Sequence, residues 1–358
     1  MAEERLSEAM LRALRMVAPG TVLYEGLENV LRARTGALIV VGDTPEVLAL
    51  VDGGFRIDAE LNPSALYELC KMDGAIILSS DARRILLANV QLQPDPMLPT
   101  QETGTRHRTA ERVARQTGQL VIAISQRRNV ITLYQGNWRY LLPEVSVLLT
   151  KANQALSTLE KYKAVLEQAL TELSALEFEG LVTLQDVVTV IQRAQMVDRI
   201  VREIQRYVVE LGSEGRLVDL QMEETLNGLE NEGLLTVKDY RASDEAPPAE
   251  QIWKTLEGWP SEQVVDPVQV ARALGYGPAV PNLDQPVTPR GYRLLNKIPR
   301  LPVPVIDNLV RTFSHLPAVL TATVEELDAV DGIGEVRAKS IKDGLRRLRD
   351  QAVLDRRL

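Results

Sequence analysis

Two polar segments in the first third of the chain contain side chains suited to binding a polyphosphate. The segment Glu102-Thr-Gly-Thr-Arg-His-Arg-Thr109 lies where a helix over 105–117 is predicted to begin. Free amides at a helix start, with hydroxyl and guanidinium groups beside them, suit phosphate oxygens. Asp73-Gly74 directly precedes an apolar run, and a carboxylate there suits a divalent ion that shares those oxygens. Together the two segments predict a site for a phosphate ester and a metal ion.

Each segment also has an ordinary interpretation. Most Asp-Gly pairs are simply turns. Clustered basic residues such as Arg106-His107-Arg108 are often solvated or paired with Asp and Glu. Only the combination of the two segments favours a phosphate site.

A third motif lies near the C-terminus, where helical spacing over 325–341 is interrupted by Gly332-Ile333-Gly334. This pattern resembles the helix-hairpin-helix module. The glycines let the backbone approach a phosphate closely, and the amides of the next helix point at the anion. Arg337 and Lys339 add positive charge. Contacts of this kind bind DNA through its backbone and without sequence readout.

This motif has three other interpretations. A dinucleotide-binding loop must follow a strand, but 324–330 has helical spacing. A plain glycine turn between packed helices, or a solvated basic face over 342–349, would bind nothing.

A degenerate copy precedes the motif at 294–302 and continues into a helix over 303–313. Because Pro299, Arg300 and Pro302 replace the glycines there, we expect this copy to support the fold more than to bind phosphate.

The elements expected to position the N-terminal motifs form a mixed α/β domain over 1–142. Short apolar runs bounded by Gly, Asp, Asn or Pro predict one sheet of about six strands. These runs are 37–41, 47–51, 75–78, 85–90, 120–124 and 130–134. Helical patterns at 6–17, 25–35, 63–71 and 105–117 would cover the sheet.

Residues 143–289 are predicted to form a helical domain. The segment 144–179 contains neither Gly nor Pro and has leucines close to heptad spacing, which predicts one long amphipathic helix. Such a stripe is more often the face of an intramolecular bundle than a free coiled coil. Further helices are expected at 184–195, 197–211 and 217–229, followed by an ordered connector over 242–289.

The remaining segment, 290–358, differs from the rest of the chain in the sign of its net charge. The whole protein has 41 Lys and Arg against 49 Asp and Glu, but 290–358 has 13 against 9. The preceding residues therefore have a net charge of −12 and the last 69 have +4, which is compatible with DNA binding by the tail. One Cys and two His exclude a Cys/His zinc site and a disulfide framework. Without a long apolar stretch, we expect a soluble, cytoplasmic protein that binds no membrane.

Asp73-Gly74-Ala75 followed by Gly104-Thr-Arg-His-Arg-Thr109 resembles the diadenylate cyclase domain, whose hallmark motifs are Asp-Gly-Ala and Arg-His-Arg. The segment 88–96 is also similar to that family. Joined to a helical spine and a helix-hairpin-helix, the whole chain resembles the DisA family of DNA integrity scanning proteins. This resemblance implies three domains: cyclase over 1–142, spine over 143–289 and DNA-binding over 290–358.

The resemblance also implies an activity, the condensation of two ATP molecules into cyclic di-AMP with release of two pyrophosphates, and the residues that perform it. Asp73 would hold Mg²⁺ or Mn²⁺. His107 would take the proton of the 3′-hydroxyl or, as we prefer, donate to a phosphate. The implied catalytic residues are Asp73, Arg106, His107 and Arg108, and the implied ATP-binding residues are Gly74, Leu92, Thr105, Arg106, His107, Arg108, Thr109 and Ser125. The implied DNA-binding residues are Gly332, Ile333, Gly334, Arg337 and Lys339.

Each active site would bind one ATP, so two sites must meet face to face, and the resemblance implies a homo-octamer. It further implies binding of branched DNA such as Holliday junctions, association with the nucleoid and a part in the response to DNA damage and its repair. One alternative is a non-catalytic scaffold that senses ATP and binds DNA junctions. A nuclease is disfavoured because the first domain has no visible acidic cluster for two-metal cleavage.

Overall fold

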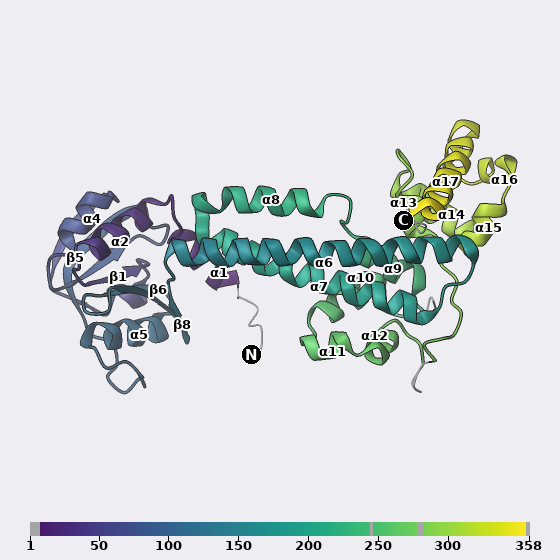
Figure 1. Ribbon diagram of the computed structural model, residues 1–358. Helices are drawn as coiled ribbons and strands as arrows, with labels where there is room; N and C mark the ends of the chain where they lie inside the picture. The colour runs from purple at the N-terminus through teal and green to yellow at the C-terminus, as the bar shows by residue number, and fades with distance from the viewer. Residues whose placement is uncertain (1–7, 244–245, 278–281, 356–358) are drawn as a thin grey trace. The chain divides into compact units, whose positions relative to one another are not determined.

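The protein is described by a computed structural model that covers residues 8–243, 246–277 and 282–355 (Figure 1). It contains two compact units. The first comprises the described residues of 4–154 and 204–220, and the second those of 155–203 and 221–358. The start of the helix predicted over 6–17, residues 244–245 and 278–281 of the predicted connector, and Arg356 and Arg357 of the basic tail lie outside the described residues.

The first unit has the predicted mixed α/β fold. Its strands form one eight-stranded sheet in the order β2-β5-β4-β1-β6-β7-β8, with β3 also paired to β5. Strands β1 and β4 are parallel, and the other pairs are antiparallel. In chain order the elements are α1 (Glu8–Met16), α2 (Val22–Arg32), β1 (Ala37–Val41), α3 (Pro45–Leu48), β2 (Val51–Asp52), β3 (Phe55–Glu60), α4 (Pro63–Leu69), β4 (Ala75–Leu78), β5 (Arg84–Leu92), α5 (Thr105–Thr117), β6 (Leu120–Ser125), β7 (Val130–Gln135) and β8 (Trp138–Leu141).

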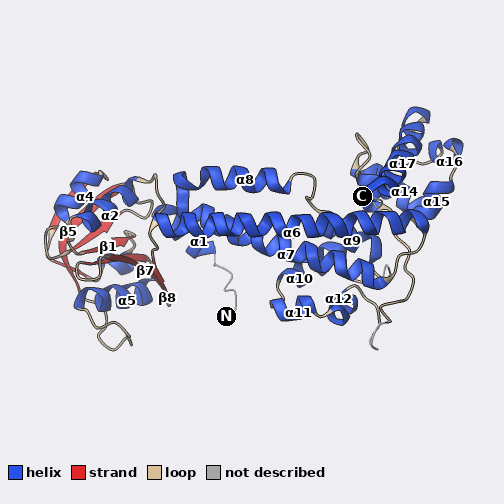
Figure 2. Cartoon of the chain, viewed as in Figure 1, coloured by secondary structure: helices blue, strands red, loops and turns tan. Residues whose placement is uncertain are grey.

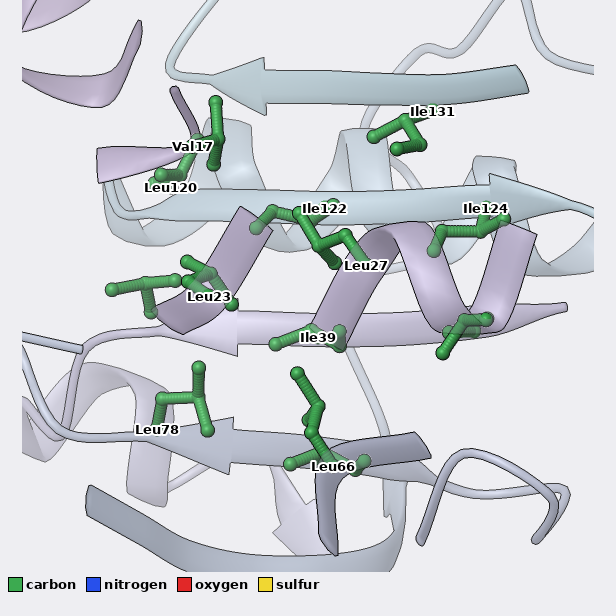
Figure 3. Close-up of a cluster of buried hydrophobic side chains, with 14 of the residues drawn as sticks. Val17, Leu23, Leu27, Ile39, Leu66, Leu78, Leu120, Ile122, Ile124 and Ile131 are labelled. Carbon is green, nitrogen blue, oxygen red and sulfur yellow. The ribbon is translucent and has the colours of Figure 1, made fainter. Parts of the chain in front are cut away.

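The sheet is covered by helices on both faces (Figure 2). Side chains alternate along each strand, so Ile39 of β1 packs toward α2 and α4, whereas Val40 packs toward α3 and α5. Figure 3 shows the first of these layers, with Leu27 of α2 and Leu66 of α4 among the strand side chains. The second layer, which includes Ala110 and Val113 of α5, fixes this helix against the sheet and thereby positions its first turn.

One predicted strand was wrong. Of the apolar run 47–51, Val47 and Leu48 end the short helix α3, which Thr44 precedes and in which Pro45 stands in the first turn. Only Val51 belongs to a strand, β2. A run of five apolar residues has no periodicity that separates strand from helix, and proline is favoured at a helix start. Strands β3, whose residues are all exposed, and the short β8 were missed, and the two-residue β2 was anticipated only at Val51.

The helical elements after the sheet largely follow the prediction. The Gly- and Pro-free segment forms the single helix α6 (Val145–Glu179). The two helices predicted over 184–211 are one continuous helix, α7 (Leu184–Leu211), because neither Gly nor Pro interrupts it. The others are η1 (Gly212–Gly215), α8 (Arg216–Leu226), α9 (Glu232–Tyr240), α10 (Ala249–Glu257), α11 (Ser261–Val265), α12 (Pro267–Ala273), α13 (Tyr292–Asn296), α14 (Val303–Phe313), α15 (Leu316–Thr321), α16 (Val324–Asp328) and α17 (Glu335–Asp355). No described helix is long and apolar enough to cross a membrane.

A buried cluster of charged groups joins α6, α9 and α13 in the second unit. The Arg293 side chain is fully buried and pairs with Glu177 of α6, and its second nitrogen lies 3.5 Å from Glu232 of α9. The Asp239 carboxylate accepts hydrogen bonds from the backbone amides of Gly291, Tyr292 and Arg293, at 2.7, 2.6 and 2.9 Å. It thereby caps α13. Burial, reinforced by Glu177, raises the pKa of Asp239 to about 7.

Candidate active site and nucleic-acid interface

Gly74 is required by a close approach between β4 and β5. Its amide donates to Asn89 Oδ1 at 3.1 Å, and a Cβ at Gly74 would lie 2.3 Å from the Asn89 carbonyl carbon. Asn89 has a φ of +53°, and the β4–β5 register shifts beside it, so the strand bulges at this point. The bulge leaves Asp73 exposed at the entrance to β4.

Gly74 and Ser125 lie at the same end of the central strands of the sheet. Strand β1 pairs in parallel with β4, Ile39 opposite Ile76, so continuation of this register places Ala37 beside Gly74. On its other side Ala37 pairs with Ile124 of antiparallel β6, and Ser125 is the next residue. Only β1 therefore separates Asp73-Gly74 from Ser125.

The first turn of α5 lies over this same end of the central strands. Arg106 crosses Gly36, the residue before β1, so closely that a Cβ at Gly36 would be 1.8 Å from the Arg106 Nη1 atom. Gly104 is the N-cap and supplies no side-chain acceptor to the first amides of α5. The Asp73-Gly74 corner, Ser125 and the Arg106 guanidinium are thus brought together around the start of β1.

The other predicted nucleotide residues differ in accessibility. Thr105 and Arg108 are exposed, whereas His107 and Thr109 are half-buried. Arg108 Nη2 donates to the Thr103 carbonyl at 3.3 Å. Leu92 is 9% exposed and belongs to the core layer beneath α5. Its side chain therefore supports the sheet, and little more than its main chain is free to contact an adenine.

A network of a hydrogen bond and an ion pair lies beside His107, and the sequence did not predict it. The Tyr134 hydroxyl donates to Glu102 Oε1 at 2.8 Å, and Arg139 Nε also lies 2.8 Å from that oxygen. The His107 ring stands edge-on to Tyr134, 6.4 Å between ring centres. Glu102 lies within the quoted motif, but Tyr134 and Arg139 come from strands β7 and β8, and no sequence spacing links them to it.

Burial lowers the pKa of His107 below its usual value. The negative charge of Glu102 opposes this shift, and the guanidinium groups of Arg106, Arg128 and Arg139 add to it. His107 is therefore held as the neutral imidazole at neutral pH, which has one N–H donor and one acceptor nitrogen.

We expect Glu102→Gln to lower the pKa of His107 further, because the substitution removes the negative charge that raises this pKa while Gln still accepts from Tyr134. The measurement is an NMR titration of ring-labelled histidine. The resonances of His107 are assigned by comparison with His315→Gln, which removes the second of the two histidines. An unchanged or raised His107 pKa would contradict the assigned geometry.

Asp73 can hold a metal ion only if a bound nucleotide supplies further oxygen atoms to that ion. Its carboxylate is exposed and forms no ion pair or hydrogen bond with any described residue. Among those residues no group of three or more His, Cys, Asp and Glu side chains could hold a metal. Mg²⁺ commonly takes one or two carboxylates and completes its shell with water and substrate phosphates. The donor set at Asp73 suits an ion of that kind, shared with a bound triphosphate.

The C-terminal hairpin has the backbone geometry expected of a phosphate-binding turn. Gly332 has a φ of +82°, Ile333 is buried, and a Cβ at Gly334 would meet no atom within 4 Å. The Arg337 guanidinium donates to the Gly332 carbonyl. Lys339 is exposed and lies 2.5 Å from Glu335, an exposed pair that is weak in water. The five predicted DNA-contacting residues thus belong to one turn and the first turns of α17.

Comparison with known families gives three matches along the chain. The nucleotide-binding region of the DisA bacterial checkpoint controller matches residues 24–138. The linker region of the same controller matches 142–283, and the helix-hairpin-helix motif matches 315–344.

Curated relatives match over nearly the whole chain. The DNA integrity scanning protein DisA of Carboxydothermus hydrogenoformans is 59% identical over 96% of this chain and 98% of its own length. That of Symbiobacterium thermophilum is 59% identical over 97% and 98%. Among solved structures, DacA from Staphylococcus aureus is similar at 19% identity with a TM-score of 0.31, covering 37% of this chain and 88% of that one.

Proposed function

The chain belongs to the DisA family of DNA integrity scanning proteins, and on that premise we propose that it condenses two ATP molecules into cyclic di-AMP and releases two pyrophosphates. The observation that carries this proposal is the meeting of the Asp73-Gly74 corner, Ser125 and Arg106 around the start of β1. The residues that carry a carboxylate, a hydroxyl and a guanidinium are thus neighbours at the start of β1, beside the first turn of α5, to which the N-cap Gly104 supplies no side-chain acceptor.

In the proposed reaction the 3′-oxygen of each ATP forms a bond to the α-phosphorus of the other. The bond from that phosphorus to the bridging oxygen of pyrophosphate breaks, and the hydroxyl proton leaves to a base. Asp73 holds Mg²⁺ or Mn²⁺, which offsets negative charge on the phosphates when bound. The triphosphate is held by the first main-chain amides of α5 and by the side chains of Thr105, Arg106, Arg108 and Thr109. His107, kept neutral by burial, donates its N–H to a phosphate oxygen.

The reaction requires two such sites facing each other, since each holds one ATP in line for attack on the other. The proposal therefore includes a homo-oligomer, of which an octamer is the form implied by the family resemblance. A symmetric pair of identical domains supplies this arrangement without a second type of subunit.

The C-terminal hairpin supports the second part of the proposal, non-sequence-specific binding of branched DNA. Its glycine turn and the start of α17 suit contacts to DNA phosphates. We propose that DNA bound there regulates the cyclase, so that the protein acts at the nucleoid as a checkpoint sensor of DNA damage.

The test of this function is to incubate the purified full chain with ATP and Mg²⁺ or Mn²⁺ and to identify products by mass spectrometry. We expect cyclic di-AMP, and ATP that binds without turnover with either metal would instead favour an ATP-sensing scaffold. In parallel, Gly334→Leu should weaken binding to a four-way junction without lowering the basal cyclase rate, because its side chain would stand where a phosphate must approach. Equal junction binding by this variant would refute the assigned hairpin.

A further inference from the structure

The C-terminal helices contain a structural repeat with a constant offset of 32 residues. Helix α13 covers 292–296 and α16 covers 324–328, while α14 begins at 303 and α17 at 335. The four helices lie at the C-terminal end of the chain (green-yellow to yellow in Figure 1). The first copy lies outside the helix-hairpin-helix match, which begins at residue 315.

Backbone hydrogen bonds and burial repeat with the same offset. The Ile298 amide donates to Leu295 O at 3.1 Å, and the Val330 amide donates to Leu327 O at 3.2 Å. At the tips of the turns, Leu301 and Ile333 are 9% and 7% exposed. The degenerate copy therefore has the backbone of a true hairpin although it lacks the glycines.

Arg300 occupies the position in the first turn that Gly332 occupies in the second. Their φ angles are +62° and +82°, both in the left-handed region that disfavours most side chains. Pro302 and Pro304 have no amide hydrogen, so this hairpin lacks part of the amide set available in the second copy. Arg300 is exposed, and no ion pair or hydrogen bond holds its guanidinium within the part of the chain that the structure describes.

The two turns share one small core. The Val305 side chain, in the first turn of α14, would lie 3.3 Å from a Cβ at Gly332. Asn308 Nδ2 of the same helix donates to Asp331 O at 3.0 Å. In the reverse direction, a Cβ at Gly344 of α17 would lie 3.1 Å from Ile298. Each copy thus packs its second helix on the other copy.

We propose that Arg300 binds a second phosphate of the same DNA that the Gly332–Gly334 turn binds. This inference rests on the DNA-binding part of the proposed function. A planar guanidinium can donate two parallel hydrogen bonds to a phosphate and so replaces the amides that the prolines remove. The two hairpins then contact DNA by different chemistry, amides in one and a side-chain cation in the other.

The test measures binding of a labelled four-way junction by fluorescence anisotropy over a range of salt concentrations, with the full chain. Arg300→Asn is the main variant, because Asn tolerates a positive φ. We expect it to bind about tenfold more weakly, as for a lost charged hydrogen bond, and to reduce the slope of log K against log salt by about 0.9. Arg300→Lys should keep the slope and recover part of the affinity.

The matched control is Arg311→Asn, which removes an exposed cation from the last turn of α14 and should change neither affinity nor slope appreciably. Wild-type affinity and slope in Arg300→Asn would overturn the inference, as would equal losses in the two variants. If wild-type protein binds no junction, or Gly334→Leu binds as tightly as wild type, the proposed DNA function fails instead. Loss in Gly334→Leu but not in Arg300→Asn refutes only the assignment of Arg300.

Discussion

Replacing Asp73 with Asn should lower the rate of cyclic di-AMP formation by about 10²- to 10³-fold, the usual loss when one electrostatic contact to a reacting group is removed. Asn has nearly the shape of Asp but no charge, so it cannot hold a divalent ion against the phosphates. The side chain is exposed and unpaired within the described structure, so we expect no loss of stability. Initial rates at saturating ATP, with Mg²⁺ and with Mn²⁺, measure the effect.

Glu60→Gln is the matched control for this prediction. It removes one exposed carboxylate from β3 in the same domain, away from the start of β1. Its rate should equal that of the wild type, and both variants should keep the oligomeric state and thermal unfolding temperature of the wild type. A cyclase rate in Asp73→Asn within a few-fold of that of Glu60→Gln would remove Asp73 from the active site.

Glu177→Ala should destabilise the second unit by about 3–5 kcal/mol, because it leaves the buried guanidinium of Arg293 short of its principal counter-charge. Glu177 also accepts from the Tyr240 hydroxyl at 2.8 Å, so the same substitution leaves a buried donor unsatisfied. The free energy of unfolding is measured by urea titration of a Trp138→Phe form of the chain. Fluorescence then reports on Trp253 and Trp259 alone, since the protein has three tryptophans, and both belong to the second unit.

Glu167→Ala provides the comparison for an exposed ion pair. Glu167 lies 3.7 Å from Lys163 on the surface of α6, and pairs of this kind contribute roughly 0–1 kcal/mol. We expect the loss in Glu177→Ala to exceed that in Glu167→Ala severalfold. Equal losses would mean that the cluster around Arg293 is not a principal support of this unit.

Features set by local sequence were predicted well. The absence of Gly and Pro over 144–179 predicts one long helix, and α6 is that helix. The pattern around Gly332 and Gly334 predicts a hairpin between helices, and the degenerate copy at 294–302 predicts a second one. Both hairpins are present. In each case steric properties of the backbone within a few residues decide the result.

Features that depend on distant partners were not predictable. Arg293 and Glu177 are 116 residues apart in the chain, and nothing near either residue indicates that it is buried with the other. Glu102 meets Tyr134 and Arg139 only because β7 and β8 complete the sheet beside α5. The start of the run 47–51 lies in α3 because Pro45 favours a helix start over strand pairing.

The most direct test of the central claim is the ratio of pyrophosphate released to cyclic di-AMP formed by the wild-type chain from ATP. Pyrophosphate is quantified enzymatically and cyclic di-AMP by mass spectrometry, in the same samples, with and without a four-way junction. Condensation at paired sites predicts two pyrophosphates for each cyclic di-AMP in both conditions, whatever DNA does to the rate. Intact ATP with no pyrophosphate in either condition, or pyrophosphate without cyclic di-AMP, would contradict it.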